Sequence, residues 1–417
     1  MKKAVFFLIT LFAWLFIAAL AGELALRIYG LFDANRGLKN SMGSVNKKYS
    51  HSFKPNTRFR LVSSKKGEYD VGVRINNFGF RGKDISLDAK PGVVRIMAIG
   101  DSFVFGVGSE DVETIPFLME EYLRAEGADV EVINAGFGHY SPALHYIRLR
   151  DEYINFKPDL VVLFFDFSDL ADDWRAERSF IYDSAGKVIG CDPLMIDGKK
   201  DWWAVCRLHS KLCSYLHNKL IRTAEKIRIL GIKNYVRAKL EGKRAKSLIV
   251  NKDSQGTDAD MIKRDGYLMM RGRDKLPVIR EHFKRTEKYL DLIKDFLGER
   301  GIPVILVLYP YGIHVGPYQW GVGRRYWGFE SGRIYDDYYA FDILEDYAAR
   351  KKVPCINLLT AFLAEKNEQL FFDIDGHFTP IANKAAADAL INNPVFQKEL
   401  GSVLQKKNAF LYKIAEE

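Results

Sequence analysis

A short apolar run ends in glycine, aspartate and serine, an arrangement that leaves a serine hydroxyl free at the end of a strand. The run covers residues 93–99, and Gly100, Asp101 and Ser102 follow it. Glycine permits a sharp turn, and the backbone N–H groups of that turn would face an oxyanion formed at the serine. An aspartate or serine in this position also commonly caps the next helix, so nucleophilic chemistry requires further groups elsewhere in the chain.

One later segment supplies what a serine nucleophile needs, namely a base to accept its proton and a carboxylate to orient that base. His377 lies close to Asp373 and Asp375, just before a predicted final helix over 379–391. The alternative for these three residues is a metal site, but no further cluster of ligands accompanies them. The sequence therefore predicts a serine hydrolase site with no metal and no cofactor.

Strands and helices alternate along much of the chain, which is typical of a parallel sheet covered by helices on both faces. Functional residues gather at the carboxyl ends of the strands in such a sheet. We therefore predict an α/β fold, a three-layer α/β/α sandwich. Its strands are expected over 70–76, 93–99, 130–134, 160–165, 304–309 and 353–358, and its helices near 115–126, 142–156, 278–300, 334–350 and 379–391.

The ordered set of motifs resembles the SGNH/GDSL hydrolase family, and in particular its membrane-anchored, extracytoplasmic members. The resemblance covers residues 71–173 and 277–395. The matching parts are the Gly-Asp-Ser of 100–102, the Asn-Ala-Gly of 134–136, the run 160–169, the Asp-Gly-His-Phe-Thr-Pro of 375–380, the segment 77–82, and Glu23 with Arg27.

The resemblance implies a catalytic triad of Ser102 as nucleophile, His377 as base and Asp375 as the carboxylate that orients the base. Asp375 precedes the histidine by two residues, as in one branch of the family. The commoner spacing of three residues falls on Ile374, which cannot serve, and Asp373 is the alternative.

The resemblance also implies an oxyanion hole, but two of the family's usual residues are replaced. The backbone N–H groups of Ser102 and Gly138 are the expected donors, although His139 occupies the place of the usual glycine. Ser168 stands where an asparagine is usual, and its hydroxyl has a shorter reach. Loss of one such donor costs about 100- to 1,000-fold in rate, so weakened activity is one expected outcome.

An aromatic loop follows the strand predicted over 304–309 and is expected to border the same site. Tyr311, Trp320, Arg324 and Trp327 are its candidate substrate-binding residues, because aromatic faces and a guanidinium could hold a sugar ring or an acyl chain. The alternative is a hydrophobic cluster under a long loop.

The N-terminus predicts a membrane anchor. Lys2 and Lys3 precede the uncharged residues 4–22, and roughly 20 apolar residues cross a bilayer as a helix. The positive flank is expected to stay cytoplasmic, so the protein would be single-pass in the cell inner membrane with a periplasmic C-terminal domain. A cleaved signal peptide is the alternative, but the apolar helical pattern continues to Tyr29.

The positive charge is concentrated in one segment. The formal net charge is +9, and residues 207–246 contain twelve lysines and arginines against two glutamates. A nucleic-acid-binding protein would show a broader footprint, so we predict no nucleic-acid partner. Anionic lipid headgroups fit better, and we predict that 207–246 is an amphipathic contact with the membrane, with a solvated helix as the alternative. One disulfide or free thiols are both compatible with the four cysteines, which are Cys191, Cys206, Cys213 and Cys355.

The predicted organisation is a membrane anchor over 1–32, a tether over 33–70, a hydrolase core in two parts over 71–174 and 277–400, a basic helical insertion over 175–276 and a tail over 401–417. The predicted function is a serine esterase for acyl, in particular acetyl, esters of an envelope polysaccharide or a lipid-linked glycan. Two alternatives stay open. One is an O-acyltransferase that forms the same acyl-enzyme beside a multi-spanning membrane acyltransferase partner, and the other is a catalytically weakened scaffold or polymer-binding component.

Overall fold

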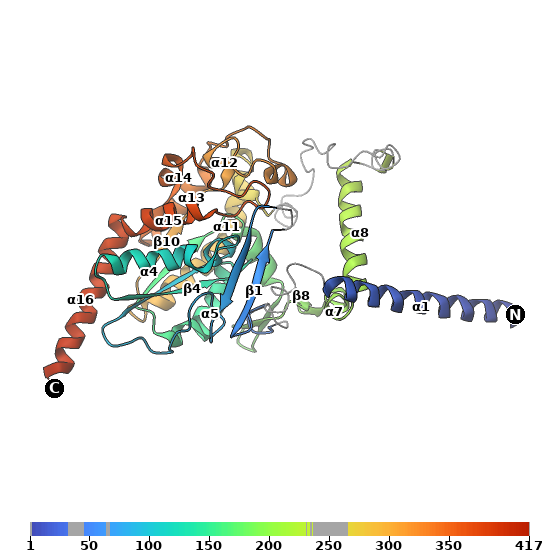
Figure 1. Ribbon diagram of the computed structural model, residues 1–417, viewed down its shortest axis with the longest axis horizontal. Helices are drawn as coiled ribbons and strands as arrows, with labels where there is room; N and C mark the ends of the chain where they lie inside the picture. Colours follow the sequence, from blue (N-terminus) through green and yellow to red (C-terminus); the bar gives the residue numbers. More distant parts are fainter. Residues whose placement is uncertain are drawn as a thin grey trace. The chain divides into compact units, whose positions relative to one another are not determined.

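The computed structural model describes residues 2–31, 46–63, 67–230, 232–233, 236 and 266–416. The chain divides into two compact units (Figure 1). The anchor unit comprises Met1–Arg36 and Pro193–Asp253, and the sheet unit comprises Gly37–Asp192 and Ser254–Glu417. Residues 175–192 thus pack with the sheet unit rather than with the predicted insertion, because a hairpin of β6 (Phe180–Tyr182) and β7 (Val188–Cys191) buries its apolar side chains there.

Five parallel strands form the centre of the sheet unit, in the order β11-β10-β5-β3-β4. The residues of β3, β5 and β10 are all buried, as expected for a sheet with helices on both faces. This arrangement confirms the predicted α/β class with a parallel sheet. The strands are β3 (Val94–Gly100), β4 (Val130–Gly136), β5 (Leu160–Phe165), β10 (Val304–Leu308) and β11 (Cys355–Asn357).

Two groups of helices pack against this sheet. The first contains α5 (Pro142–Asp151), α6 (Asp169–Glu177), α11 (Leu276–Gly298) and α13 (Tyr339–Lys351), and the second contains α4 (Ile115–Ala125), α14 (Leu359–Ala364), α15 (Pro380–Ile391) and α16 (Pro394–Glu416). Most of the predicted tail, 401–417, is therefore helix. The short helices are α3 (Ser102–Phe105), α12 (Gly312–Val315) and the 3-10 turns Asp111–Glu113, Tyr153–Phe156, Leu268–Met270, Arg273–Lys275 and Gly323–Trp327.

Ser102 follows the strand at which the order of the sheet reverses. The next strand in the chain, β4, pairs with one side of β3, whereas β5 pairs with the other side. The carboxyl end of β3 is therefore the switch point of the sheet, and open α/β sheets generally bind their ligands at such a point.

Much of the segment predicted as a tether packs on the sheet unit. Strand β1 (Thr57–Val62) pairs antiparallel with β2 (Asp70–Ile75). Phe53 is buried and its ring lies 5.0 Å from that of Phe105, the last residue of α3. Isolated aromatic side chains in a polar segment carry no periodicity, so the sequence pattern did not reveal this packing.

The anchor unit contains α1 (Lys2–Leu31), β8 (Met195–Ile196), β9 (Lys199–Lys200), α7 (Trp202–His209) and α8 (Lys211–Leu230). The stretch Val5–Leu31 is long and apolar enough to cross a membrane. A disulfide joins Cys206 to Cys213, with Cα atoms 6.0 Å apart, while Cys191 and Cys355 are free. Most of the predicted basic segment beyond 230 lies outside the described residues.

Two glycines let the turn after Ser102 lie directly on the strand ends. Gly100 and Gly136 face each other across β3 and β4. A Cβ atom on Gly136 would lie 2.2 Å from the backbone nitrogen of Phe105, and one on Gly100 would lie 2.5 Å from Val104 Cγ2. A side chain at Gly136 would therefore push α3, and Ser102 with it, away from the sheet.

We expect Gly136→Ala to lower the free energy of unfolding by about 1–3 kcal/mol, the usual cost of overpacking a core. Denaturant unfolding of the detergent-solubilised full chain measures this change. Gly298→Ala is the matched control, since no atom lies within 4 Å of a Cβ at that position. Equal stability of the two variants would contradict the close contact between α3 and β4.

Candidate active site

Ser102, His377 and Asp375 form a continuous chain of hydrogen bonds. The hydroxyl of Ser102 donates to His377 Nε2 at 2.8 Å, and His377 Nδ1–H donates to Asp375 Oδ1. Ser102 begins α3 after β3, whereas Asp375 and His377 lie in the loop before α15. The structure thus brings together the three residues that the sequence assigned to a triad, with the hydrogen bonds that proton transfer from the serine requires.

Asp373, the alternative carboxylate, has a different role. Its Oδ1 accepts the backbone N–H of Val322 at 3.0 Å, and its carbonyl accepts those of Val322 and Gly323. This aspartate therefore ties the triad loop to the aromatic loop instead of orienting the histidine. No group of three or more potential metal ligands occurs among the described residues.

Two residues from the predicted tether hold the Asp375 carboxylate in place. Tyr69 donates its hydroxyl to Asp375 Oδ2 at 3.0 Å. Glu68 accepts the backbone N–H groups of Ile374 at 2.6 Å and of Asp375 at 3.1 Å. Asp375 thus presents one oxygen to His377 while the other is occupied, which fixes the plane of the carboxylate.

The electrostatics of the pair suit a histidine that accepts a proton. Burial by itself lowers the pKa of His377, but the charge of Asp375 and its hydrogen bond outweigh this effect and raise that pKa above its usual value. Burial likewise raises the pKa of Asp375, yet the histidine charge and the hydrogen bonds from His377 and Tyr69 lower it overall. Asp375 is therefore a carboxylate at neutral pH and is placed to stabilise an imidazolium at His377.

Asp101 and Arg81 fix the turn that carries Ser102. Asp101 Oδ1 accepts the backbone N–H of Phe103 at 2.9 Å, which caps α3. Arg81 is buried and donates to the carbonyls of Phe105, Gly106 and Ser109. The two ends of this single helical turn are thus both satisfied by side chains, so the serine is held without a longer helix.

Asp101 also lies beside the hydroxyl of Ser102. Its Oδ2 is 3.2 Å from Ser102 Oγ, and burial, followed by the charge of Asp166, raises its pKa to about 7. The serine hydroxyl has a single proton, and the shorter contact directs it to His377. Asp101 and Asp166 share the hydroxyl of Tyr309, so both are parts of a buried network under the site.

Two backbone N–H groups are open at the predicted oxyanion hole. In the part of the chain that the structure describes, those of Ser102 and Gly138 have no hydrogen-bond acceptor. His51 donates from Nε2 to the carbonyl of Gly138 at 2.8 Å, and burial lowers the pKa of His51 to about 4, so it is neutral. His139 is exposed and adopts a left-handed conformation with φ of 61°, which turns the peptide after Gly138 sharply.

Ser168, the third predicted oxyanion donor, keeps only its hydroxyl for this role. Its backbone N–H donates to Asp166 Oδ1 at 2.5 Å. Among the described residues the hydroxyl has one contact, with Asp172 Oδ2 at 3.5 Å, which is at the limit of a hydrogen bond. Asp166 also accepts the hydroxyl of Tyr311 at 2.7 Å, so this aspartate is structural.

Three of the four residues predicted to bind substrate are buried. Tyr311 bonds Asp166, and Arg324 donates to the carbonyls of four loop residues. Trp320 lies under the triad loop, where a Cβ atom on Gly376, which has φ of 89°, would be 2.4 Å from its indole nitrogen. These side chains support the site from below, and Trp327, half exposed, is the one that faces solvent.

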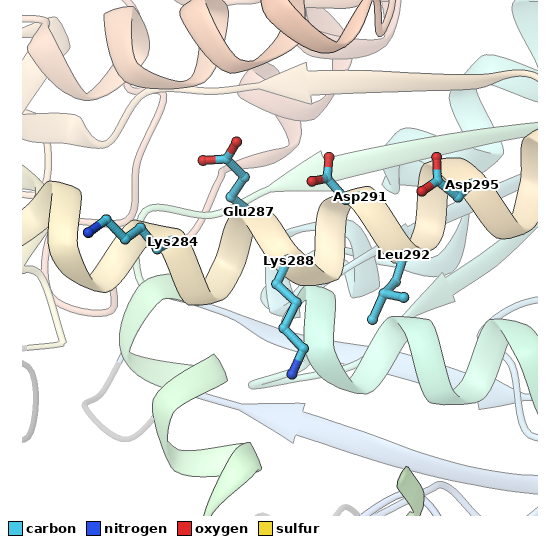
Figure 2. A pocket seen from close by; sticks show the side chains of 6 residues that line it. All are labelled: Lys284, Glu287, Lys288, Asp291, Leu292 and Asp295. Carbon is cyan, nitrogen blue, oxygen red and sulfur yellow. The ribbon is translucent and has the colours of Figure 1, made fainter. Parts of the chain in front are cut away.

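A surface hollow of about 430 Å³ lies along α11, away from the triad residues, and its charges are already paired. Glu287 accepts from Arg350, and Asp291 accepts from Lys351. Figure 2 shows the lining side chains pointing outward to opposite sides of the helix rather than toward a common point. This region is therefore a solvated helix face rather than a second site.

Comparison with known proteins yields matches among solved structures alone. No protein-family model and no curated protein matches the chain. An acetyl xylan esterase is 16% identical over 71% of this chain and 97% of its own, with a TM-score of 0.34. The lipase/acylhydrolase from Enterococcus faecalis is 15% identical over 72% and 93%, with a TM-score of 0.34. A variant of an acetyl-xylooligosaccharide esterase from Geobacillus Stearmophilus is 12% identical over 72% and 92%, with a TM-score of 0.36.

At such identities and TM-scores, the activity of this chain has to be argued from its own site. The predicted α/β sandwich with a parallel sheet is confirmed, with Ser102 at the switch point of that sheet and with Asp375 and His377 in the loop before α15. The supporting residues His51, Glu68 and Tyr69 were missed, because single polar residues in an aperiodic segment give no signal without the fold. Arg81 lies in the 77–82 motif, but that motif did not reveal its contact with α3.

The ionisation of His377 predicts the pH dependence of the reaction. Only the neutral imidazole accepts the serine proton, so kcat/KM should rise with pH through the raised pKa of His377, above the ordinary value of about 6.5. In Asp375→Asn the attraction that raises this pKa is lost, so the rise should move to lower pH while kcat falls by up to about 10,000-fold. A pH profile of ester hydrolysis for both proteins measures this, and an unshifted rise in Asp375→Asn would contradict the pairing.

Removal of the Tyr69 hydroxyl should shift the same profile in the opposite direction. In Tyr69→Phe the carboxylate of Asp375 loses a donor that partly neutralises it, so it attracts the imidazolium proton more strongly. Compared with the parent protein, we expect kcat/KM of Tyr69→Phe to rise at a higher pH and its kcat to be lower. Tyr122→Phe is the matched control, because that half-buried tyrosine lies on α4 away from the triad. A profile identical to the parent would assign Tyr69 to packing alone.

Proposed function

We propose that the protein is a membrane-anchored serine esterase that cleaves acyl, in particular acetyl, esters of a cell-envelope polysaccharide or lipid-linked glycan. The observation that carries the proposal is the hydrogen-bonded series Ser102, His377 and Asp375 at the carboxyl edge of the sheet. A serine that only capped α3 would need neither of the other two residues, and the cap is supplied by Asp101.

The reaction follows from this geometry. Ser102 Oγ attacks the ester carbonyl carbon while its proton moves to His377 Nε2, and the carbonyl electron pair moves onto oxygen. The resulting oxyanion is held by the N–H groups of Ser102 and Gly138, with the hydroxyl of Ser168 as a third donor. Collapse of the intermediate expels the alcohol, which takes the proton from His377. Water then attacks the acyl-enzyme by the same steps and releases the acid.

Two observations support a location outside the cytoplasm. Helix α1 can span a membrane by length and composition, and Lys2 and Lys3 at its start favour a cytoplasmic N-terminus. The disulfide between Cys206 and Cys213 lies beyond this helix in the chain and favours an oxidising compartment. We therefore place the esterase on the periplasmic side of the inner membrane.

The exposed surroundings of Ser102 favour an ester on a large, polar substrate. Ser102, Gly138 and Ser168 are partly accessible, and His139 beside them is exposed. Ring contacts lead from His377 through Phe103, Tyr311 and Tyr267 to the half-exposed Trp327. A sugar next to the acylated one could stack on this indole, as sugars do on exposed aromatic faces.

The same acyl-enzyme would serve an O-acyltransferase if a sugar hydroxyl replaced water. A multi-spanning membrane acyltransferase would then be the expected partner and acyl donor. The scaffold alternative is disfavoured by the aligned triad, since a non-catalytic component gains nothing from a serine bonded to a histidine.

We expect Ser102→Ala to lower the kcat for hydrolysis of an aryl acetate by more than about 1,000-fold, measured on the full chain in detergent micelles. Ser184→Ala is the matched control, because that serine is exposed in the turn between β6 and β7. Equal rates in both variants would contradict the proposed nucleophile.

The second arm of the experiment identifies the acceptor. An acetylated envelope polysaccharide is incubated with the protein, with and without a deacetylated acceptor chain. We expect free acetate in both cases, as an esterase requires. If acetyl groups appear only on the acceptor chain and no free acetate forms, the activity is transfer and not hydrolysis.

A further inference from the structure

The anchor unit exposes a set of large apolar side chains on α7 and α8. These two helices meet at Ser210 and are joined by the disulfide between Cys206 and Cys213. No residue of α7 is buried. The exposed apolar residues are Trp202 (69% exposed), Trp203 (59%), Leu208 (48%), Tyr215 (49%), Leu216 (47%) and Leu220 (63%). Apolar surface of this kind on a helical pair marks a contact with a partner or a membrane.

Charged side chains of α1 fix the junction of α7 and α8. Glu23 accepts the hydroxyl of Ser210 and the backbone N–H groups of Lys211 and Leu212, at 2.8–3.1 Å. It thus acts as the N-cap of α8, although it belongs to another helix. Arg27, one turn later, donates to the side chain of Glu23 and to the backbone carbonyl of His209, which is the last residue of α7. The start of α8 is therefore fixed on α1 at the level of Glu23.

That level coincides with the edge of a membrane. About 20 residues of helix cross the hydrocarbon core, and the uncharged run 4–22 within α1 ends directly before Glu23. Helix α8 runs across α1 rather than alongside it (Figure 1). A helix that leaves a spanning helix crosswise at this level lies along the membrane surface.

The side chains of α8 suit that surface. Tyr215, Leu216, Lys219 and Leu220 follow the spacing that puts residues on one helix face. Leu212 belongs to the same face and lies beside Gly22, where a Cβ atom would be 3.6 Å from its Cδ1. The helix sequence carries five lysines and arginines against one glutamate, and tryptophans such as those that begin α7 are typical of the interface between lipid and water.

We propose that α7 and α8 form a lipid-binding element of the anchor unit. Its apolar face enters the boundary between headgroups and acyl chains, and its cations contact the phosphates of anionic phospholipids. The element holds the protein close to the membrane in addition to α1. This proposal concerns the anchor unit and does not depend on the esterase activity of the sheet unit.

Spin labels on the full chain in lipid nanodiscs test the depth of α8. Leu216→Cys and Leu220→Cys carry labels on the apolar face, and Asn218→Cys, exposed on the opposite face, is the matched control. The unsubstituted protein, labelled identically, reports any background from its free cysteines. At 216 and 220 we expect more frequent collisions with oxygen, which dissolves in lipid, than with a water-soluble nickel chelate, and the reverse at 218.

Two results would overturn the proposal. If all three labels collide mainly with the nickel chelate, α8 is exposed to water and does not bind the membrane. If all three are shielded from both reagents, protein rather than lipid covers the helix. Hydrolysis of an aryl acetate in the same nanodiscs checks that the labelled proteins are folded, and inactivity of every form, parent included, would count against the esterase alone.

The lipid composition tests the role of the cations. We expect the oxygen-to-nickel collision ratio at 216 to rise severalfold when phosphatidylglycerol is added to neutral phosphatidylcholine nanodiscs. In Lys211→Gln/Lys219→Gln this rise should shrink and should also disappear at high salt. If the collision ratio at 216 in the parent protein is the same with and without phosphatidylglycerol, the proposed phosphate contacts are contradicted.

Discussion

The hydrogen bond between Ser102 Oγ and His377 Nε2 joins segments that are 275 residues apart, and the chemistry of the site depends on its length. Such a bond weakens steeply when the atoms move out of the range of about 2.5–3.2 Å, so both segments must be fixed to within a fraction of an ångström. On the serine side this precision comes from the contact of α3 with Gly136. On the histidine side it comes from the loop around Gly376, which closes over Trp320.

The side chains that hold the loops of the site are bonded to other groups of the protein. Arg81 satisfies the carbonyls at the end of α3, His51 binds the carbonyl of Gly138, and Tyr69 with Glu68 holds the loop of Asp375. In the proposed esterase, a site arranged in this way would need little reorganisation when charge develops on the ester oxygen, and such preorganisation is usually the largest contribution to the rate enhancement. Ser168 is held less firmly, because in the described part of the chain its hydroxyl has one weak contact and can turn toward an oxyanion.

The sequence predicted the parts of this structure that depend on periodicity and on ordered motifs. The parallel strands, Ser102 at the end of β3 and the order of Asp375 and His377 before a helix all follow from such patterns. The roles of Tyr311, Trp320 and Arg324 did not follow, because an aromatic or basic residue in a long loop has the same appearance whether it faces a substrate or lies under the loop. The packing of the segment 46–69 could not be predicted for the same reason. Its buried side chains are identified by their contacts in the folded structure and not by a sequence pattern.

The central claim is that Ser102 is a nucleophile activated by His377. The most direct measurement is the mass of the peptide containing Ser102 after the full chain reacts with a fluorophosphonate, which forms a stable adduct with an activated serine. We predict an adduct on Ser102 that forms faster as His377 loses its proton and that is abolished by His377→Ala. An unmodified Ser102 peptide, under conditions in which a known serine esterase is fully modified, would contradict the account.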